Sequence, residues 1–251
     1  MTRLAFLAAL SSAALTVATP AIAQGDLRAE IEADYKANLA SLFDHFHRHP
    51  ELSHREFKTA ERLAKEIRAL GFEVTEKVGG TGVVAVMKNG AGPTVMIRAD
   101  MDGLPIKEDS GLANAATVTQ EDIDGVVKPV MHACGHDTHI TALVGTARAL
   151  AARKGLWKGT LVLIAQPAEE RISGARDMIN DGLYTRFPKP DYALAFHVAA
   201  DRPSGKIEVP LLAGSSSDSV DIVVRGVGTH GASPNKGIDP VLVAAQIVVS
   251  L

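Results

Sequence analysis

Residues 94–103 read TVMIRADMDG: a short apolar segment that ends in two aspartates. Two later segments repeat this pattern, since residues 160–170 read TLVLIAQPAEE and residues 192–197 read YALAFH. Each segment passes directly from an apolar run into acids or a histidine. Because open α/β sheets bind ligands beyond the carboxyl ends of their strands, we expect these polar side chains to meet at one edge of a sheet.

Helical patterns lie between the expected strands. Residues 57–70 place apolar side chains at helical spacing, and residues 140–152 and 175–180 are also expected to be helical. Residues 83–87 resemble a further strand. Apolar strands that alternate with helices predict an α/β fold with a mostly parallel sheet, in which the strand at 192–196 is buried.

Composition excludes several classes of protein. The 251 residues carry 29 acids and 26 bases, with a formal net charge of −3, so no basic surface for nucleic acid is indicated. With 46% hydrophobic and 22% charged residues, the chain resembles an ordinary soluble globular protein. Its length allows one large domain or two modest ones.

The first 23 residues resemble a secretory signal peptide. Arg3 precedes an apolar run at residues 4–19, and Ala21-Ile22-Ala23 resembles a cleavage site. A membrane anchor is the alternative, but the run is shorter than the roughly 20 apolar residues of a spanning helix. We therefore expect export, with the periplasm as the destination, and no membrane contact after cleavage.

The single cysteine, Cys134, excludes an intramolecular disulfide. An exported free thiol is open to oxidation unless something binds it. Metal ligation would protect it.

A change of composition near residues 205–215 indicates a domain boundary. The chain becomes rich in Gly and Ser there, residues 219–224 resemble an alternating strand, and Asp239-Pro240 is a typical helix start. We expect a catalytic domain over residues 24–207 and the first part of a second domain over residues 208–251.

The run HACGHDTH at residues 132–139 is the most specific chemical feature. Thiolate, imidazole and carboxylate are usual ligands of zinc and similar divalent metals. The adjacent Glu169 and Glu170 can divide the work, one binding metal and the other acting as general base for a water. A metal lowers the pKa of that water from about 15.7 to roughly 7.

Each of these elements also has a simpler interpretation. Asp100 and Asp102 could close a turn, Glu169 and Glu170 could open a helix, and His197 could be a core histidine. Four histidines near the N-terminus resemble a metal tract, but no acids are arranged around them, so we interpret them as surface or packing residues. They are His45, His47, His49 and His54.

Five ordered motifs resemble the aminoacylase/carboxypeptidase-type metallopeptidases, in particular the amidohydrolase branch of hippurate hydrolases and indole-acetyl-amino-acid hydrolases. The motifs are residues 98–106 (RADMDGLPI), 131–139 (MHACGHDTH), 166–170 (QPAEE), 197–198 (HV) and 228–234 (GTHGASP). Residues 49–53 (HPELS) with Glu56 and residues 59–60 also resemble the opening of that branch. The similarity runs from about residue 40 to the end of the sequence.

The resemblance implies a site for two divalent metal ions, either zinc or manganese, with nickel or cobalt as further options. Its metal ligands would be Cys134, His136, Glu170 and His197, with Cys134 in the bridging place. Glu169 would be the general base, and Asp102 would orient the site from behind the ligands. The implied reaction is hydrolysis of the amide bond of N-acyl amino acids or similar peptide-like substrates.

The resemblance also implies a lid and a homodimer. His230 matches a lid histidine that reaches the partner subunit's site and stabilises the oxyanion. Members of the family are longer, and after the lid their chain returns to supply one more histidine ligand. We therefore expect this chain to be a fragment with weak or no activity.

Two other functions stay open. A cysteine hydrolase would use Cys134 with a nearby histidine, but it gives the glutamates and aspartates no role. A catalytically weak or inactive exported binding remnant would keep the substrate pocket without turnover.

Overall fold

The structure, a computed structural model, describes residues 24–209 and 220–251. The chain forms two compact units: the first ends at Ala200, and the second runs from Asp201 to Leu251. The predicted signal peptide lies outside the described residues, and the boundary expected between residues 207 and 208 stays a prediction. Among the described helices, none is both long and apolar enough to cross a membrane.

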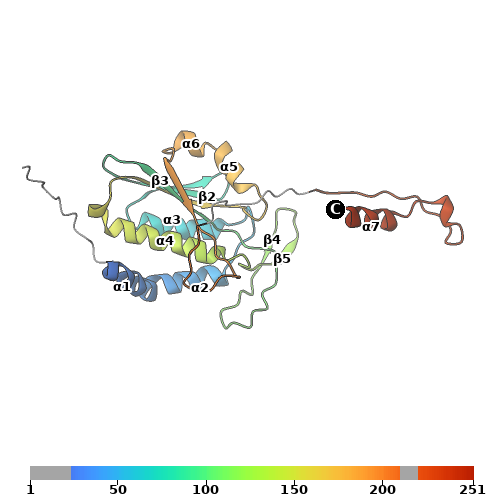
Figure 1. The fold of residues 1–251 in the computed structure, drawn as a ribbon, viewed down its shortest axis with the longest axis horizontal. Helices are drawn as coiled ribbons and strands as arrows, with labels where there is room; N and C mark the ends of the chain where they lie inside the picture. Colours follow the sequence, from blue (N-terminus) through green and yellow to red (C-terminus); the bar gives the residue numbers. More distant parts are fainter. Residues whose placement is uncertain (1–23, 210–219) are drawn as a thin grey trace, which may run out of the picture. The chain divides into compact units, whose positions relative to one another are not determined.

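A five-stranded sheet forms the centre of the first unit (Figure 1). Its strands, in spatial order, are β1 (Glu73–Val78), β2 (Gly82–Asn89), β6 (Gly159–Gln166), β3 (Thr94–Asp100) and β7 (Tyr192–Ala195). The pairs β3–β6 and β3–β7 are parallel, whereas β1–β2 and β2–β6 are antiparallel. The α/β class is confirmed, but the sheet is mixed rather than mostly parallel because the β1–β2 hairpin occupies one side of it.

Helices cover both faces of this sheet (Figure 1). On one face α3 (Phe57–Arg68) and α4 (His136–Ala152) pack against the strands, and on the other lie α5 (Gly174–Asn180) and α6 (Leu183–Arg186). The N-terminal helices pack on α4; they are α1 (Gln24–Asp34), the π-helical turn η1 (Tyr35–Leu39) and α2 (Ala40–Arg48).

Alternation along the strands builds two apolar layers. In β2, Val83, Ala85 and Met87 join the cluster under α3 and α4, while Val84 and Val86 join the cluster under α5 and α6. Full burial of such a side chain contributes roughly 1.5–3 kcal/mol. Both faces of β2 and β6 are therefore apolar, as expected for central strands.

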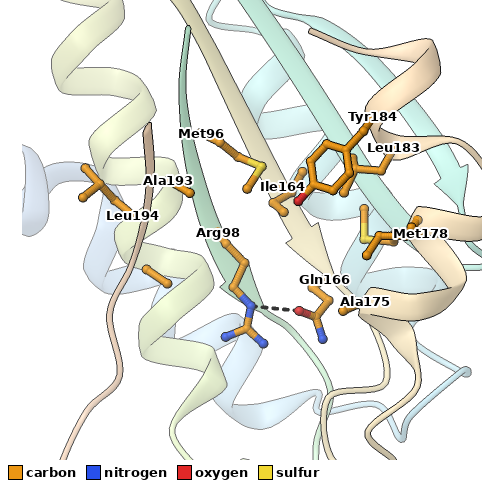
Figure 2. Close-up of a pocket in the computed structure, with 12 residues that line it drawn as sticks. Met96, Arg98, Ile164, Gln166, Ala175, Met178, Leu183, Tyr184, Ala193 and Leu194 are labelled. Carbon is orange, nitrogen blue, oxygen red and sulfur yellow. Dashed lines mark hydrogen bonds between the residues drawn. The ribbon is translucent and has the colours of Figure 1, made fainter. Parts of the chain in front are cut away.

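The strand β7 is exposed, which corrects the expectation of burial. Tyr192 is 65% exposed and Leu194 is 59% exposed, although the segment is apolar. The strand lies at the edge of the sheet and pairs with β3 alone. Beside it, a hollow of about 320 Å³ opens between the strands and α5–α6. At one end of the hollow Arg98 donates to Gln166 (Figure 2).

A small hairpin and a short helix complete the first unit. The hairpin pairs β4 (Thr119–Glu121) with β5 (Val127–Pro129), and the 3-10 helix η2 (Lys154–Leu156) precedes β6.

The second unit contains the 3-10 helix η3 (Pro234–Lys236) and α7 (Pro240–Ser250). The predicted start of α7 is confirmed, because the Asp239 carboxylate accepts the N–H of Val241 at 2.9 Å. The alternating strand predicted at 219–224 is not formed over its described residues. Over the described residues of the second unit, strand pairing is limited to one bridge between Val227 and Ile238, and a strand needs a neighbouring ladder to persist.

Candidate metal centre

The ends of three strands and the start of a helix meet where the sequence predicts a site. The segments after β3, β6 and β7 converge on the N-terminus of α4, as their parallel pairing requires. Gly135 lies just before α4 with φ +81°. A Cβ at this position would lie 2.4 Å from Cγ2 of Val198, so the close approach of the two loops requires glycine.

His136 is the most deeply placed of the predicted ligands, with an exposed fraction of 0%. Its Nδ1 lies 2.8 Å from the backbone oxygen of Asp102, so Nδ1–H donates to that carbonyl. This hydrogen bond fixes the tautomer that leaves a lone pair on Nε2. The Nε2 atom is buried and has no hydrogen-bond partner among the residues that the structure describes.

The other predicted ligands surround this free nitrogen. Oε1 of Glu170 lies 3.8 Å from His136 Nε2, and it is likewise buried without a hydrogen-bond partner in the described part of the chain. The Cys134 Sγ, His136 and Glu170 ligand atoms all lie within 4.8 Å of one another, and Nε2 of His197 is 3.3 Å from Cys134 Sγ. Two facing polar atoms left unsatisfied in a buried site fit a bound cation, which would satisfy both.

The charges of the site also favour a cation. Burial, with the nearby charges of Glu170 and Glu169, raises the pKa of the Cys134 thiol to about 11. Burial, with the nearby charges of Asp102 and Glu169, raises the pKa of Glu170 against the opposing charge of His136. Burial alone would lower the pKa of His136, but Asp102 and Asp100 outweigh it and the net shift is upward. The site is therefore short of positive charge in the absence of a metal.

A second group of possible ligands consists of Asp100, His136, His139 and His197. Within it, His139 has both ring nitrogens engaged: Nδ1 lies 2.6 Å from Oδ1 of Asp100, and Nε2 accepts the N–H of Val198 at 3.0 Å. The other oxygen of Asp100 pairs with Arg98 at 2.7 Å. We therefore interpret Asp100 and His139 as a buried pair that fixes the backbone next to His197, not as metal ligands.

The sequence did not predict that Asp100 and His139 form a pair. The Asp100 pKa is lowered to about 2, because the hydrogen bond to His139 and the charges of His136 and Arg98 outweigh the effect of burial. One feature of the sequence could have indicated a role for His139: it lies three residues after His136, and therefore on the same side of the helix.

Asp102 lies directly behind the ligands. Its Oδ2 accepts the Ser53 hydroxyl at 2.7 Å and the backbone N–H of Glu170 at 3.0 Å. Burial opposes ionisation, but hydrogen bonds from His136 and Ser53 lower its pKa. The contacts fit the orienting role that the resemblance implies, and they give a role to Ser53, the last residue of the HPELS motif, to which the sequence assigned none.

Glu169 is partly open to solvent. Its side chain is 40% exposed, and Oε2 lies 4.0 Å from His136 Nε2. A carboxylate beside the ligands that stays accessible to solvent can reach a water molecule, as a general base must.

The N-terminal histidines need one correction. His47 does have acids around it: its Nδ1 lies 2.7 Å from Asp137 Oδ2, and its Nε2 lies 3.4 Å from Glu108 Oε1. It is a half-buried residue whose ion pair with Asp137 ties α2 to α4. The rings of His45 and His49 lie against each other in a tilted arrangement, with centroids 4.7 Å apart and an interplanar angle of 32°, at the end of α2.

His230 lies in the second unit, where it is exposed and its Nδ1 accepts the N–H of Ala232 at 3.1 Å. Its predicted role at the site of a partner subunit stays a prediction.

The fold and the cluster define a class: α/β proteins with a candidate cation site at the carboxyl edge of the sheet. Residues 96–245 match the model of peptidase family M20/M25/M40. The chain is 41% identical over 208 residues to thermostable carboxypeptidase 2 of Saccharolobus solfataricus, with 80% of this chain and 49% of that protein covered. It is 37% identical over 222 residues to hippurate hydrolase of Campylobacter jejuni, with 87% and 54% covered.

A solved structure of a family member supports the same assignment. The Bacillus subtilis YXEP protein, a dinuclear metal-binding peptidase of the M20 family, superposes with a TM-score of 0.60 at 33% identity, with 68% of this chain and 45% of that chain covered. The chain belongs to peptidase family M20/M25/M40. It spans about half the length of the curated relatives it matches.

Proposed function

We propose that this chain carries the metal-binding and proton-transfer part of an amidohydrolase that cleaves N-acyl amino acids or related peptide-like substrates. The observation that carries the proposal is the pair of buried, unsatisfied atoms, His136 Nε2 and Glu170 Oε1, which face each other at 3.8 Å. The names of the hippurate hydrolase and carboxypeptidase relatives support an amide substrate next to a carboxylate.

The metal ligands in this proposal are Cys134, His136, Glu170 and His197, and they suit two divalent cations. Such cations supply Lewis acidity, which polarises a carbonyl and lowers the pKa of water. The ligand chemistry favours zinc, with manganese, nickel or cobalt compatible.

Glu169 moves the proton. Its carboxylate accepts a proton from the attacking water and donates it to the nitrogen of the amide, so that the amine leaves as a neutral group. His136 is held in the required tautomer by the carbonyl of Asp102, and the Asp102 side chain holds the Glu170 backbone. These contacts hold His136 and the Glu170 backbone in place. They leave the Glu169 carboxylate free to move the proton.

The cysteine hydrolase is the weaker alternative. A nucleophilic cysteine needs a lowered pKa, which neighbouring cations provide. Here burial and two glutamates raise the pKa of Cys134 to about 11, which disfavours the thiolate. The same surroundings are suited to a thiol that ionises on binding a metal.

The test is the substitution Glu169→Gln in the full chain, compared with Glu61→Gln on the exposed side of α3. We expect Glu169→Gln to retain metal, measured by elemental analysis after gel filtration, and to lower the hydrolysis rate of N-acetyl and N-benzoyl amino acids by about 10²–10⁴-fold. Glu61→Gln should change neither quantity. Hydrolysis at the parent rate in Glu169→Gln would exclude Glu169 as the base.

Metal content also separates the enzyme from a binding remnant. If the chain binds metal and substrate but shows no hydrolysis that depends on Glu169, it is a binding remnant and not an enzyme. Absence of bound metal in the purified parent chain, even after incubation with zinc, would contradict the proposed metal centre itself.

Export and assembly are further parts of the proposal. The sequence of residues 1–23 supports export to the periplasm, and the family resemblance supports a homodimer in which His230 of the partner subunit stabilises the oxyanion. Cell fractionation and sedimentation equilibrium test these two statements separately.

A further inference from the structure

Glu56 is a buried carboxylate to which the proposed reaction gives no role. Its exposed fraction is 0%, and it stands immediately before α3. Its Oε1 accepts the backbone N–H of Ala168 at 2.8 Å, and its Oε2 accepts the hydroxyl of Thr81 at 2.5 Å. Both oxygens are therefore engaged, one of them on the residue that precedes the glutamate pair.

Ala168 has an unusual backbone. Its φ is +46°, in the left-handed region that residues with a Cβ rarely occupy, and its side chain is 0% exposed. Such a conformation persists only where its surroundings impose it. The carbonyl of Ala168 accepts the N–H of Ser173 at 3.3 Å and of Gly174 at 3.2 Å. Glu56 thus holds the N–H of this residue, and the far end of the turn holds its carbonyl.

The direction of the chain after Ala168 decides where Glu169 and Glu170 point. A rotation of the Ala168 backbone by one conformational well would redirect both side chains away from His136. The only side-chain acceptor on the Ala168 N–H among the described residues is Glu56.

A residue that only filled this buried space would not need to be a carboxylate. Burial raises the pKa of Glu56 to about 7, against the hydrogen bonds from Thr81 and Ala168, so the ionised side chain is costly at this position. An apolar residue of similar volume would avoid that cost but would leave the Ala168 N–H without a partner.

We propose that Glu56 is a positioning residue for the glutamate pair, acting by holding the Ala168 peptide in its left-handed conformation. The proposal rests on the roles proposed for Glu169 and Glu170. It extends the site to a segment of the chain 112 residues away from the turn.

The chain offers a matched control in Glu51. This residue is also buried, at 7% exposed, and belongs to the same segment. Its Oε2 accepts the N–H of Thr59 at 2.7 Å, in the first turn of α3, and among the described residues its carboxylate makes no hydrogen bond to the turn at residues 168–174. Substitution of Glu51 therefore disturbs a buried glutamate without disturbing Ala168.

The experiment compares Glu56→Met, Glu56→Gln and Glu51→Met in the full chain by amide hydrogen exchange and zinc titration. Loss of the acceptor in Glu56→Met should speed exchange in residues 168–174 by about 10-fold. It should also weaken zinc binding by about 10–100-fold, as loss of outer support does at metal sites. Glu56→Gln keeps an acceptor oxygen and should resemble the parent chain, while Glu51→Met should affect only the start of α3.

A rescue variant tests whether Glu56 acts through the backbone conformation of Ala168. Adding Ala168→Gly to Glu56→Met should recover part of the zinc affinity, because glycine adopts positive φ without steric cost. If Glu56→Met fails to fold, Glu56→Asp serves instead, since its shorter carboxylate cannot keep both hydrogen bonds; it should open the same turn.

Unchanged exchange in the turn in Glu56→Met or Glu56→Asp would overturn the proposal, as would equal opening of the turn by Glu51→Met. The exchange result is decisive whether or not zinc binds. A parent chain that binds no zinc would instead contradict the proposed function, so the two failures are distinguishable.

Discussion

The candidate metal centre has an inner half and an outer half that differ in how the chain holds them. The inner half is fully buried, with exposed fractions of 0–1%; it consists of Asp100, Asp102, His136 and His139. The outer half is partly or fully exposed and consists of Cys134, Glu169, Glu170 and His197. Inner residues lie at the end of β3 and in the first turn of α4, whereas outer residues lie in the loops that follow β6 and β7 or precede α4.

This difference separates two tasks. Hydrogen bonds such as His136 Nδ1–H to the Asp102 carbonyl set the inner geometry before any metal arrives. The outer half provides the charged atoms that a cation would draw together. We therefore expect substitution of the inner ligand His136 to abolish the site, and substitutions whose effect reaches only an outer ligand to weaken it.

The largest effect is expected from His136→Ala, because its Nε2 is the centre on which the other ligand atoms converge. Zinc affinity should fall by more than about 100-fold, exceeding the loss typical of residues behind the ligands. A competition titration measures the affinity, and His45→Ala on α2 is the matched histidine control. Retention of parent affinity by His136→Ala would place the cation elsewhere.

Cys134 tests the outer half through its pKa. In the metal-free chain at pH 8, alkylation by iodoacetamide should be about 100-fold slower than for an ordinary protein thiol, because the pKa is raised from 9.0 to about 11. The rate should rise with pH until that pKa is passed. Zinc should block the reaction, and Glu170→Gln should speed it by removing a negative charge. An inflection near pH 8 would contradict the account of the site's charges.

The smallest effect is expected from His139→Gln, which spares every proposed ligand. This substitution disturbs the link from Asp100 to the backbone N–H of Val198, so His197 alone loses support. We expect zinc affinity to fall by about 10-fold, with the thermal transition changed little beyond that of His49→Gln. A loss as large as that of His136→Ala would instead make His139 a ligand.

The sequence predicted the elements that local patterns encode. The apolar runs of β3 and β6, the helix that follows the HACGH run and the Asp239-Pro240 start of α7 are all confirmed, since each depends on neighbours a few residues apart. The convergence of Cys134, His136 and Glu170 followed from parallel strands that end at one edge.

What the sequence did not predict depends on distant partners. The exposure of β7 follows from its place at the edge of the sheet, which its apolar composition does not reveal. Asp100 and His139 are 39 residues apart, and His47 and Asp137 are 90 residues apart. No periodicity records such pairs, so the inner hydrogen bonds and the roles of Ser53 and Glu56 emerged only from the folded chain.

One carboxylate joins segments that are far apart along the chain, and this has a consequence for the order of folding. The Asp102 side chain binds the hydroxyl of Ser53, 49 residues before it, and the backbone N–H of Glu170, 68 residues after it. Closing both loops costs chain entropy that only the completed sheet repays. We therefore expect the proposed cation site to form late in folding, so that the rate at which refolding chains acquire zinc would report the final step.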